Sequence, residues 1–307
     1  MPVVLFSARS ERWESYETPL REALAEVGLA HARLTTDAAP DDVDYIVYAP
    51  NSGLSDFRPY TRLKAVLNLW AGVEDVVGNA TLTVPLARMV DPGLEEGMVE
   101  WVLAHVLRHH LGIDTHIHGQ DGIWRLGAPP LARDRRVAVL GLGSLGAAVA
   151  QALVALKFQV SGWARQPKTI TGVTCHTGLE TALRGAEIVV LLLPDTPATQ
   201  NVIDARSLDW LAPGAVILNP GRGPLIDDAA LLAALDTGRI GHATLDTFRT
   251  EPLPTDHPFW SHPRVTVTPH IASETRPGSA ARVIAENIRR GEAGEPFLHI
   301  VDRGLGY

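Results

Sequence analysis

The 307-residue sequence has one cysteine, no excess of basic residues and no uninterrupted apolar stretch as long as a membrane span. A single thiol, Cys175, cannot form an internal disulfide, so the fold does not rely on oxidation. No basic neighbour except His176 could activate this thiol, so we expect it to have a structural role. Lys and Arg number 27 against 35 Asp and Glu, which gives a formal net charge of −8. Nucleic acids and anionic membrane surfaces are therefore poor candidate partners.

Targeting and membrane signals are also weak. The N-terminal apolar run is too short for a signal-peptide core and follows no basic region. Val137–Leu156 has about the length of a membrane span, but three glycines, Ser144 and Gln151 interrupt it. A strand, a turn and a helix account for these interruptions, whereas a membrane helix does not. We therefore expect a cytoplasmic protein without a membrane partner.

The first 110 residues alternate strand-like and helix-like segments, which predicts an α/β unit with a parallel sheet. Apolar runs predict strands at 3–7, 45–48, 65–69 and from 84. Helical spacing predicts helices at 19–27, stopped by Gly28, and at about 97–111. A loop rich in glycine and proline follows at 119–130, and we expect it to link two domains.

The second half of the sequence predicts a doubly wound dinucleotide-binding fold. Six short apolar strands are expected, at 137–140, 159–163, 188–193, 215–219, 243–246 and 265–268, with helical segments between most of them. A helix at about 280–290 should pack back on the first domain, because a lone terminal helix needs a surface to bury against.

A G-x-G-x-x-G turn joins the first of these strands to a helix. Its residues are Gly141, Leu142, Gly143, Ser144, Leu145 and Gly146. The strand before it and the helix after it are the context that the motif requires. The glycines permit a tight turn, close approach to a pyrophosphate and close helix–strand packing, and the helix start faces the phosphates. The alternative is a glycine-rich turn that binds nothing.

The end of the second strand of this domain predicts the choice of cofactor. An acidic residue there binds the ribose of NAD, but the sequence reads Trp163-Ala164-Arg165, with Lys168 close behind. A guanidinium suits a 2′-phosphate. We therefore predict NADPH as the preferred cofactor, with NAD as a possible second one. The alternative is that Arg165 and Lys168 are solvated loop charges.

Three polar side chains follow the ends of later strands. Arg222 lies after 215–218, Glu251 after the strand at 243, and His270 after the strand at 265. Ligands of open α/β sheets bind at such carboxyl ends. Singly, each residue has a structural explanation, but together they suit hydride transfer to a ketone beside a carboxylate. Arg222 would anchor the carboxylate and polarise the keto oxygen, His270 would donate a proton, and Glu251 would orient the ring.

Four segments resemble the D-2-hydroxyacid dehydrogenase family over nearly the whole chain. They are the glycine-rich turn, N-P-G-R-G-P-L-I-D, L-D-T-F-R-T-E-P-L-P and T-P-H-I-A-S. The glyoxylate/hydroxypyruvate reductase branch is suggested by residues 163–165, 86–91, 275–277 and 301–307. The resemblance implies two Rossmann-like doubly wound domains: a discontinuous substrate domain, 1–97 plus 275–307, and an NAD(P)-binding domain, 98–274, inserted into it. It also implies a cleft that closes on the substrate and a homodimer.

The resemblance assigns further residues. Ala71, Gly72 and Val73 would offer backbone amides to the substrate carboxylate, with Trp70 beside them and Ser273 near the substrate. Asp246 would hold the nicotinamide carboxamide. Other cofactor contacts would come from Leu193, Pro194, Thr199, Pro220, Gly221 and Ala272. The family's arginine block usually reads Ala-Arg-Gly; here Gly221 precedes Arg222, and we expect it to leave room in the cleft. The resemblance implies a small 2-oxo acid substrate, glyoxylate or hydroxypyruvate first, reduced to the 2-hydroxy acid.

Two other functions remain open from the sequence. One is a related dehydrogenase with a different 2-hydroxy acid or with formate, phosphite or a phosphorylated substrate; the neighbourhood of Gly72 offers a phosphate little beyond Arg88. The other is a nucleotide-sensing binding protein that has lost turnover. The histidines at 105, 109, 110, 116 and 118 lack a His-Glu-x-x-His pattern, so we predict no metal site. Trp124, in the loop that follows, is a candidate contact to a neighbouring subunit.

Overall fold

The computed structural model describes residues 1–306; Tyr307, the last residue of the segment 301–307, lies outside the described residues. The chain divides into two compact units, each described here by itself. Unit 1 contains Met1–Leu94 and the chain from Thr275 onward, and unit 2 is Glu95–Glu274. The loop 119–130 lies inside unit 2, so our expectation that it links two domains is wrong.

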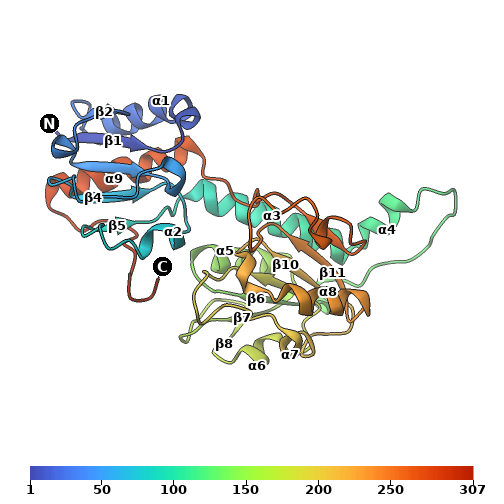
Figure 1. Ribbon diagram of the computed structural model, residues 1–307. Helices are drawn as coiled ribbons and strands as arrows, with labels where there is room; N and C mark the ends of the chain where they lie inside the picture. The colour runs from blue at the N-terminus through green and yellow to red at the C-terminus, as the bar shows by residue number, and fades with distance from the viewer. Residues whose placement is uncertain (307) are drawn as a thin grey trace. The chain divides into compact units, whose positions relative to one another are not determined.

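Unit 1 is built on a five-stranded parallel sheet with the order β2-β1-β3-β4-β5. The strands are β1 (Val3–Ser7), β2 (Arg33–Thr35), β3 (Tyr45–Tyr48), β4 (Ala65–Asn68) and β5 (Leu86–Ala87). Helices α1 (Ser10–Glu26) and α9 (Pro277–Ala293) share one apolar core with the sheet, and the short α2 (Glu74–Val77) joins a second core. The terminal helix therefore packs on the first unit, as expected (Figure 1).

Helix α1 differs from the sequence prediction. Helical spacing predicts a helix over 19–27, but the helix begins at Ser10 and contains Pro19 in its interior. Tyr16 and Leu20, one turn apart, are both buried in the core of unit 1. The burial of these two side chains offsets the hydrogen bond that Pro19 cannot donate.

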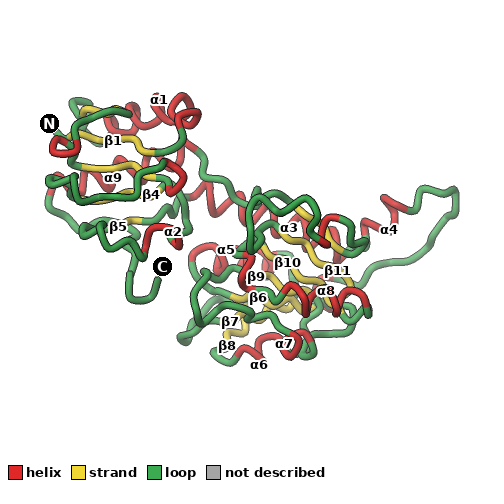
Figure 2. Tube along the Cα trace, viewed as in Figure 1, coloured by secondary structure: helices red, strands yellow, loops and turns green. Residues whose placement is uncertain are grey.

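Unit 2 contains a seven-stranded parallel sheet with the order β12-β11-β10-β9-β6-β7-β8 (Figure 2). The strands are β6 (Arg136–Leu140), β7 (Gln159–Trp163), β8 (Val173–His176), β9 (Ile188–Leu191), β10 (Ala215–Asn219), β11 (Ile240–Leu245) and β12 (Val265–Val267). The six predicted strands are present, and β8 was missed. Strands β7 and β8 are added on one side of β6, and β9 to β12 are added on its other side. Folds of this kind bind ligands at the point where the strand order reverses, here between β6 and β9. The predicted doubly wound α/β class is confirmed.

Helices cover the sheet of unit 2. The main ones are α3 (Pro92–His110, which starts in unit 1), α5 (Ser144–Ala155), α6 (Leu179–Leu183), α7 (Ala205–Leu208) and α8 (Asp228–Asp236). The ambiguous run 137–156 is thus strand β6, a turn and α5. Across residues 1–306, no helix is both long enough and apolar enough to cross a membrane.

One segment of unit 2 projects from its sheet. It consists of α4 (Ile113–His118) and the loop to residue 131, and we call it the arm (Figure 1). Its large apolar side chains are exposed: Ile113, Ile117, Ile123, Trp124, Leu126 and Leu131. Single exposed apolar residues are ordinary, but a run of six along one projecting segment is typical of a surface that another protein covers.

Candidate active site

The glycine-rich turn between β6 and α5 has a geometry that only glycine allows. Gly141 has a φ of 100°, and a Cβ there would lie 2.4 Å from the carbonyl oxygen of Leu192. A Cβ on Gly146 would lie 1.7 Å from the carbonyl oxygen of Gly141. A Cβ on Gly143, in contrast, would meet nothing within 4 Å. Two glycines therefore close the turn, and the third leaves open space above it.

This open space fits a dinucleotide pyrophosphate. The exposed Gly143 and Ser144 lie at the start of α5, a helix of 12 residues, where free backbone N–H groups and the helix dipole favour an anion. No side chain caps this helix. The Ser144 hydroxyl donates to Glu95 at 3.1 Å. The turn thus has the donors and the clearance that a phosphate needs.

The segment after β9 is fixed beside this turn. Leu192 N–H donates to the Leu140 carbonyl at 2.7 Å, which extends the pairing of β9 with β6. The buried Thr199 hydroxyl lies 2.6 Å from the Pro194 carbonyl and accepts from the Thr196 N–H at 2.9 Å. Thr199 therefore holds the shape of the 194–199 loop, with Leu193 buried beneath it.

The end of β7 carries no acidic side chain. Trp163 donates its indole N–H to the Thr177 carbonyl at 3.0 Å, which ties this strand end to the neighbouring β8. Ala164 is half-buried, and Arg165 and Lys168 are exposed in the loop that follows. Both charged residues of the segment 163–168 are basic, which suits a phosphate rather than a free ribose hydroxyl pair.

Two glycines place Arg222 beside the loop that carries Glu251. A Cβ on Gly223 would lie 2.0 Å from the carbonyl carbon of Phe248, so only glycine lets the loop after β11 pack this closely on the loop after β10. A Cβ on Gly221 would lie 2.7 Å from the carbonyl oxygen of Leu191. The expectation that Gly221 leaves room in the cleft is therefore wrong, because strand β9 fills that space.

Glu251 and His270 form a hydrogen-bonded pair. Nδ1 of His270 lies 2.7 Å from Oε2 of Glu251, and the Phe248 N–H donates to Oε1 at 2.9 Å. An ionised carboxylate only accepts, so Nδ1 carries the proton of this pair. The histidine side chain is 49% exposed. Within residues 1–306 its other nitrogen, Nε2, has no hydrogen-bond partner.

The surroundings of Glu251 keep it ionised. Burial acts to raise the pKa of its carboxyl group, but the hydrogen bonds from His270 and the Phe248 N–H and the charges of His270 and Arg222 outweigh burial, so the pKa is lowered. The ionised carboxylate accepts the hydrogen bond from Nδ1 and so fixes the orientation of the ring. The positive end of Arg222 acts on the same carboxylate, so the three predicted catalytic residues lie together in unit 2.

Asp246 shapes the turn that presents His270. Its carboxylate is fully buried and accepts hydrogen bonds from the Thr268 hydroxyl at 2.5 Å and from the N–H groups of Ile271 and Ala272 at 2.9 Å each. Its carbonyl accepts from the His270 N–H at 2.8 Å. His270 has a φ of 55°, a conformation that L residues rarely adopt. Asp246 thus accepts four hydrogen bonds, and these hold the turn.

Comparison with known proteins agrees with this geometry. Residues 101–272 match the family model for the D-isomer specific 2-hydroxyacid dehydrogenase NAD-binding domain. The chain belongs to the D-isomer specific 2-hydroxyacid dehydrogenase family. It is 42% identical over 257 residues to the glyoxylate/hydroxypyruvate reductase A of Serratia proteamaculans, covering 80% of this chain and 82% of that one.

Solved structures of this dehydrogenase family share the fold. A D-isomer specific 2-hydroxyacid dehydrogenase from Xanthobacter autotrophicus in complex with NADPH and MES has a TM-score of 0.91 and 42% identity, covering 100% of this chain and 99% of that chain. An NADPH-dependent glyoxylate/hydroxypyruvate reductase from Sinorhizobium meliloti in complex with NADP and sulfate has a TM-score of 0.87 and 32% identity, covering 100% of both.

The predicted site residues fall into two groups. Unit 2 brings together the catalytic trio and Asp246, and it carries the glycine-rich turn. It also contains the remaining predicted cofactor residues, and Ser273. Unit 1 contains the exposed Trp70, the half-buried Ala71 and Gly72, and the buried Val73, in the turn after β4. Sequence reasoning missed Thr268 and the packing role of Gly223, although both are adjacent to predicted motifs.

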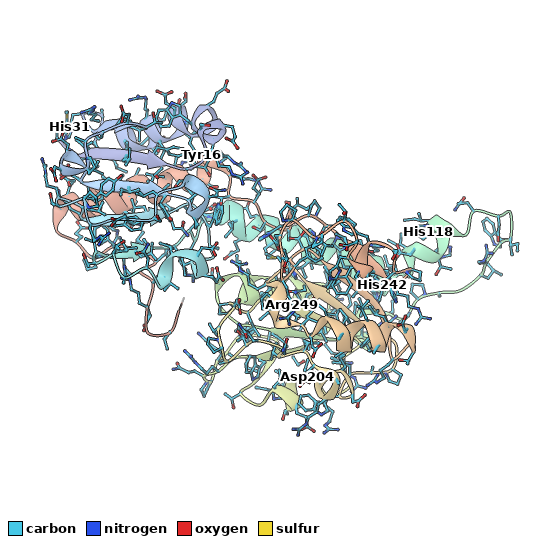
Figure 3. The ribbon with its side chains drawn as sticks, viewed as in Figure 1. Tyr16, His31, His118, Asp204, His242 and Arg249 are labelled. Atoms are coloured by element: carbon cyan, nitrogen blue, oxygen red, sulfur yellow. The ribbon has the colours of Figure 1, made fainter. Side chains whose placement is uncertain are left out.

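Of the histidines of α3, His109 lies against strand β11 of unit 2. His109 Nε2 lies 3.0 Å from the Thr244 hydroxyl, and its ring centre is 4.9 Å from that of His242. Burial, together with neighbouring positive charges, lowers the pKa of His109 to about 3 and of His242 to about 4. His242 lies on the sheet and His118 on the projecting arm (Figure 3). No three His, Cys, Asp or Glu side chains in the described chain are grouped as metal ligands.

Proposed function

We propose that the protein is an NADPH-preferring reductase of small 2-oxo acids, with glyoxylate and hydroxypyruvate as the first candidates and the 2-hydroxy acids as products. The observation that carries the proposal is the His270–Glu251 hydrogen bond of 2.7 Å, with the charge of Arg222 acting on the same carboxylate. The names of the Serratia and Sinorhizobium relatives support the substrate class. NADPH, when bound, supplies the hydride.

The residues of the chain would act as follows. Arg222 binds the substrate carboxylate and polarises the keto oxygen with two donors in a fixed fork. His270 donates a proton from Nε2 to that oxygen as it becomes an alkoxide. Glu251 holds the Nδ1 proton and stabilises the charged ring until the proton leaves. The backbone N–H groups of Ala71, Gly72 and Val73 offer further donors to the carboxylate, and Ser273 lies near the substrate.

Cofactor binding would use the turn 141–146, the loop containing Pro194 and Thr199, and Pro220. Arg165 and Lys168 would bind the 2′-phosphate of NADP, which agrees with the cofactors in the two related structures. Asp246 keeps its predicted contact with the nicotinamide carboxamide as part of this proposal, beside its observed role in shaping the His270 turn.

We also propose that the enzyme is a homodimer in which the arm packs on the second copy. The exposed apolar side chains of the arm, Trp124 and Leu126 at 86% exposure among them, support this assembly. Sedimentation at micromolar concentration tests it. A double replacement of Trp124 and Leu126 by serine should give a monomer, and a dimer that persists unchanged would count against the arm. The cytoplasmic location stays a prediction.

The function is tested by mixing the protein with NADPH and each acid and following the absorbance of the reduced nicotinamide. We expect rapid consumption with NADPH, slower consumption with NADH, and none with Arg222→Ala. Binding of NADPH without consumption of it by any small 2-oxo acid would favour the nucleotide-sensing alternative. Consumption with NADH alone would contradict the roles of Arg165 and Lys168.

A further inference from the structure

Arg88 is a half-buried cation that has no counter-ion within residues 1–306. It directly follows β5 in unit 1. Within residues 1–306, no carboxylate, carbonyl or hydroxyl group accepts a hydrogen bond from its guanidinium. Other basic side chains of unit 1 are paired: Arg62 with Asp44 at 3.2 Å, and Lys64 with Glu292 at 2.6 Å. Arg33 of the same unit is also unpaired in the described chain but exposed, whereas Arg88 carries its unpaired charge in a half-buried position, which needs an explanation.

A buried charge is costly unless an anion or several acceptors satisfy it. Burial lowers the pKa of Arg88, yet a guanidinium stays charged in proteins. The side chain thus retains five donors in a fixed fork, a geometry that suits carboxylates and other oxygen groups. An external ligand with oxygen acceptors would offset the cost of burial.

The sheet register places Arg88 beside the turn 70–73. Strand pairs Val66–Leu86 and Leu67–Ala87 bring the ends of β4 and β5 level, so Arg88 follows at the same edge of the sheet as Asn68. The Met89 N–H then donates to the Trp70 carbonyl at 3.0 Å. Side chains alternate along a strand, so Arg88 lies on the Leu86 side of the sheet.

Val73 packs on that same side. It shares the apolar core that contains Leu86, on the face opposite to Ala87. Arg88 and Val73 are therefore at one carboxyl-end edge and on one face of a parallel sheet, and Ala71 and Gly72 lie in the turn that leads to Val73. That edge is where open α/β sheets bind ligands.

The turn itself is prepared for an anion. The buried Asn68 donates from its amide to the Trp70 carbonyl at 2.9 Å and the Gly72 carbonyl at 2.8 Å, so the carbonyls are occupied. The N–H groups of residues 71–73 donate to no acceptor in the described chain. Unit 1 thus has two sets of unpaired donors within residues 1–306, the backbone N–H groups and the Arg88 guanidinium, at the same edge of its sheet.

We propose that Arg88 is a specificity residue that binds an oxygen-bearing group at the distal end of the 2-oxo acid, while the N–H groups of residues 71–73 hold the first carboxylate. This proposal rests on the proposed function and adds a substrate preference to it. A hydroxymethyl group or a second carboxylate satisfies the guanidinium, whereas a methyl group or a hydrogen leaves it unpaired. The enzyme therefore favours hydroxypyruvate over pyruvate, although the two differ by a single hydroxyl group.

The test measures kcat/KM for four acids: glyoxylate, pyruvate, hydroxypyruvate and oxaloacetate. Arg88→Met keeps the length of the side chain but removes all donors, and Arg88→Lys keeps the charge. Arg33→Met is the matched control, because Arg33 is an exposed arginine on β2 of the same unit. Thermal melting of each variant checks that unit 1 is folded.

With Arg88→Met we expect kcat/KM for hydroxypyruvate and oxaloacetate to fall about tenfold or more, as for loss of a charged hydrogen bond. Glyoxylate and pyruvate should change by less than about threefold. Arg88→Lys should recover part of the loss with oxaloacetate, and Arg33→Met should match the parent. Equal changes with all four acids, or no change with any, would overturn the proposal. An unmodified protein that reduces none of them would instead refute the proposed function.

Discussion

Replacement of Asp246 by asparagine is the sharpest test of how the His270 turn is held. The fully buried carboxylate accepts three hydrogen bonds, two of them from backbone N–H groups of Ile271 and Ala272. An asparagine keeps one acceptor oxygen and turns an NH₂ group toward a backbone N–H donor. One charge-assisted hydrogen bond is lost and two donors face each other without water, which costs about 2–4 kcal/mol of unfolding free energy.

The assay compares urea unfolding with steady-state kinetics. Stability should fall by the amount above, a large part of the 5–15 kcal/mol that holds a typical domain together. The value of kcat should fall further than KM rises, because the His270 turn is released while the Arg222 loop is unchanged. Asp209→Asn is the control, since that carboxylate is 77% exposed. Unfolding free energy within about 0.5 kcal/mol of the parent would refute the argument, because surface substitutions alone have effects of that size.

Three further predictions concern the same unit. Gly223→Ala puts a Cβ 2.0 Å from the Phe248 carbonyl carbon, so kcat/KM should fall about tenfold or more while NADPH affinity, measured by fluorescence titration, changes little; weakened NADPH binding alone would contradict this. Glu251→Gln replaces the carboxylate that accepts the His270 Nδ1 hydrogen bond by a neutral amide, so kcat should fall about tenfold or more; an unchanged kcat would argue against the pair. The pKa of His109 (about 3) and of His242 (about 4) lies below the ordinary 6.5, so the unfolded chain binds more protons in acid. Stability should therefore fall between pH 6.5 and 4, by up to about 1.4 kcal/mol per pH unit for each ring, and urea midpoints of His109→Gln should show a smaller fall.

Local sequence signals were sufficient for much of the fold. Strands β1, β3, β7 and β10 were predicted with their observed bounds, because each is a short apolar run ended by a turn signal. Edge strands β2 and β8 were missed, since few of their side chains are buried and their apolar pattern is weak. The start of α1 was misplaced because the predicted apolar face began at Leu20, whereas the helix begins at Ser10 and also buries Tyr16 in the same core.

Motifs identified the candidate site, but not the way it is assembled. The spacing of Gly141, Gly143 and Gly146 was enough to predict a dinucleotide turn. The reason for Gly221 was misjudged, because its neighbour Leu191 is thirty residues away in the chain and adjacent only in the sheet. The sequence shows Arg88 as a basic residue near Gly72. Only the structure shows that, within residues 1–306, its guanidinium has no hydrogen-bond acceptor.

The sequence by itself determined the alternation of strands and helices, the dinucleotide turn and the identities of Arg222, Glu251 and His270. These follow from residue type and short spacing, which act through local backbone preference and periodic burial. Only the tertiary structure decided that Gly223 brings the Arg222 and Glu251 loops into contact and that Asp246 holds the His270 turn. Such contacts join residues far apart in the chain, which meet only when parallel strands lie side by side. Local sequence patterns do not determine the distances between such residues.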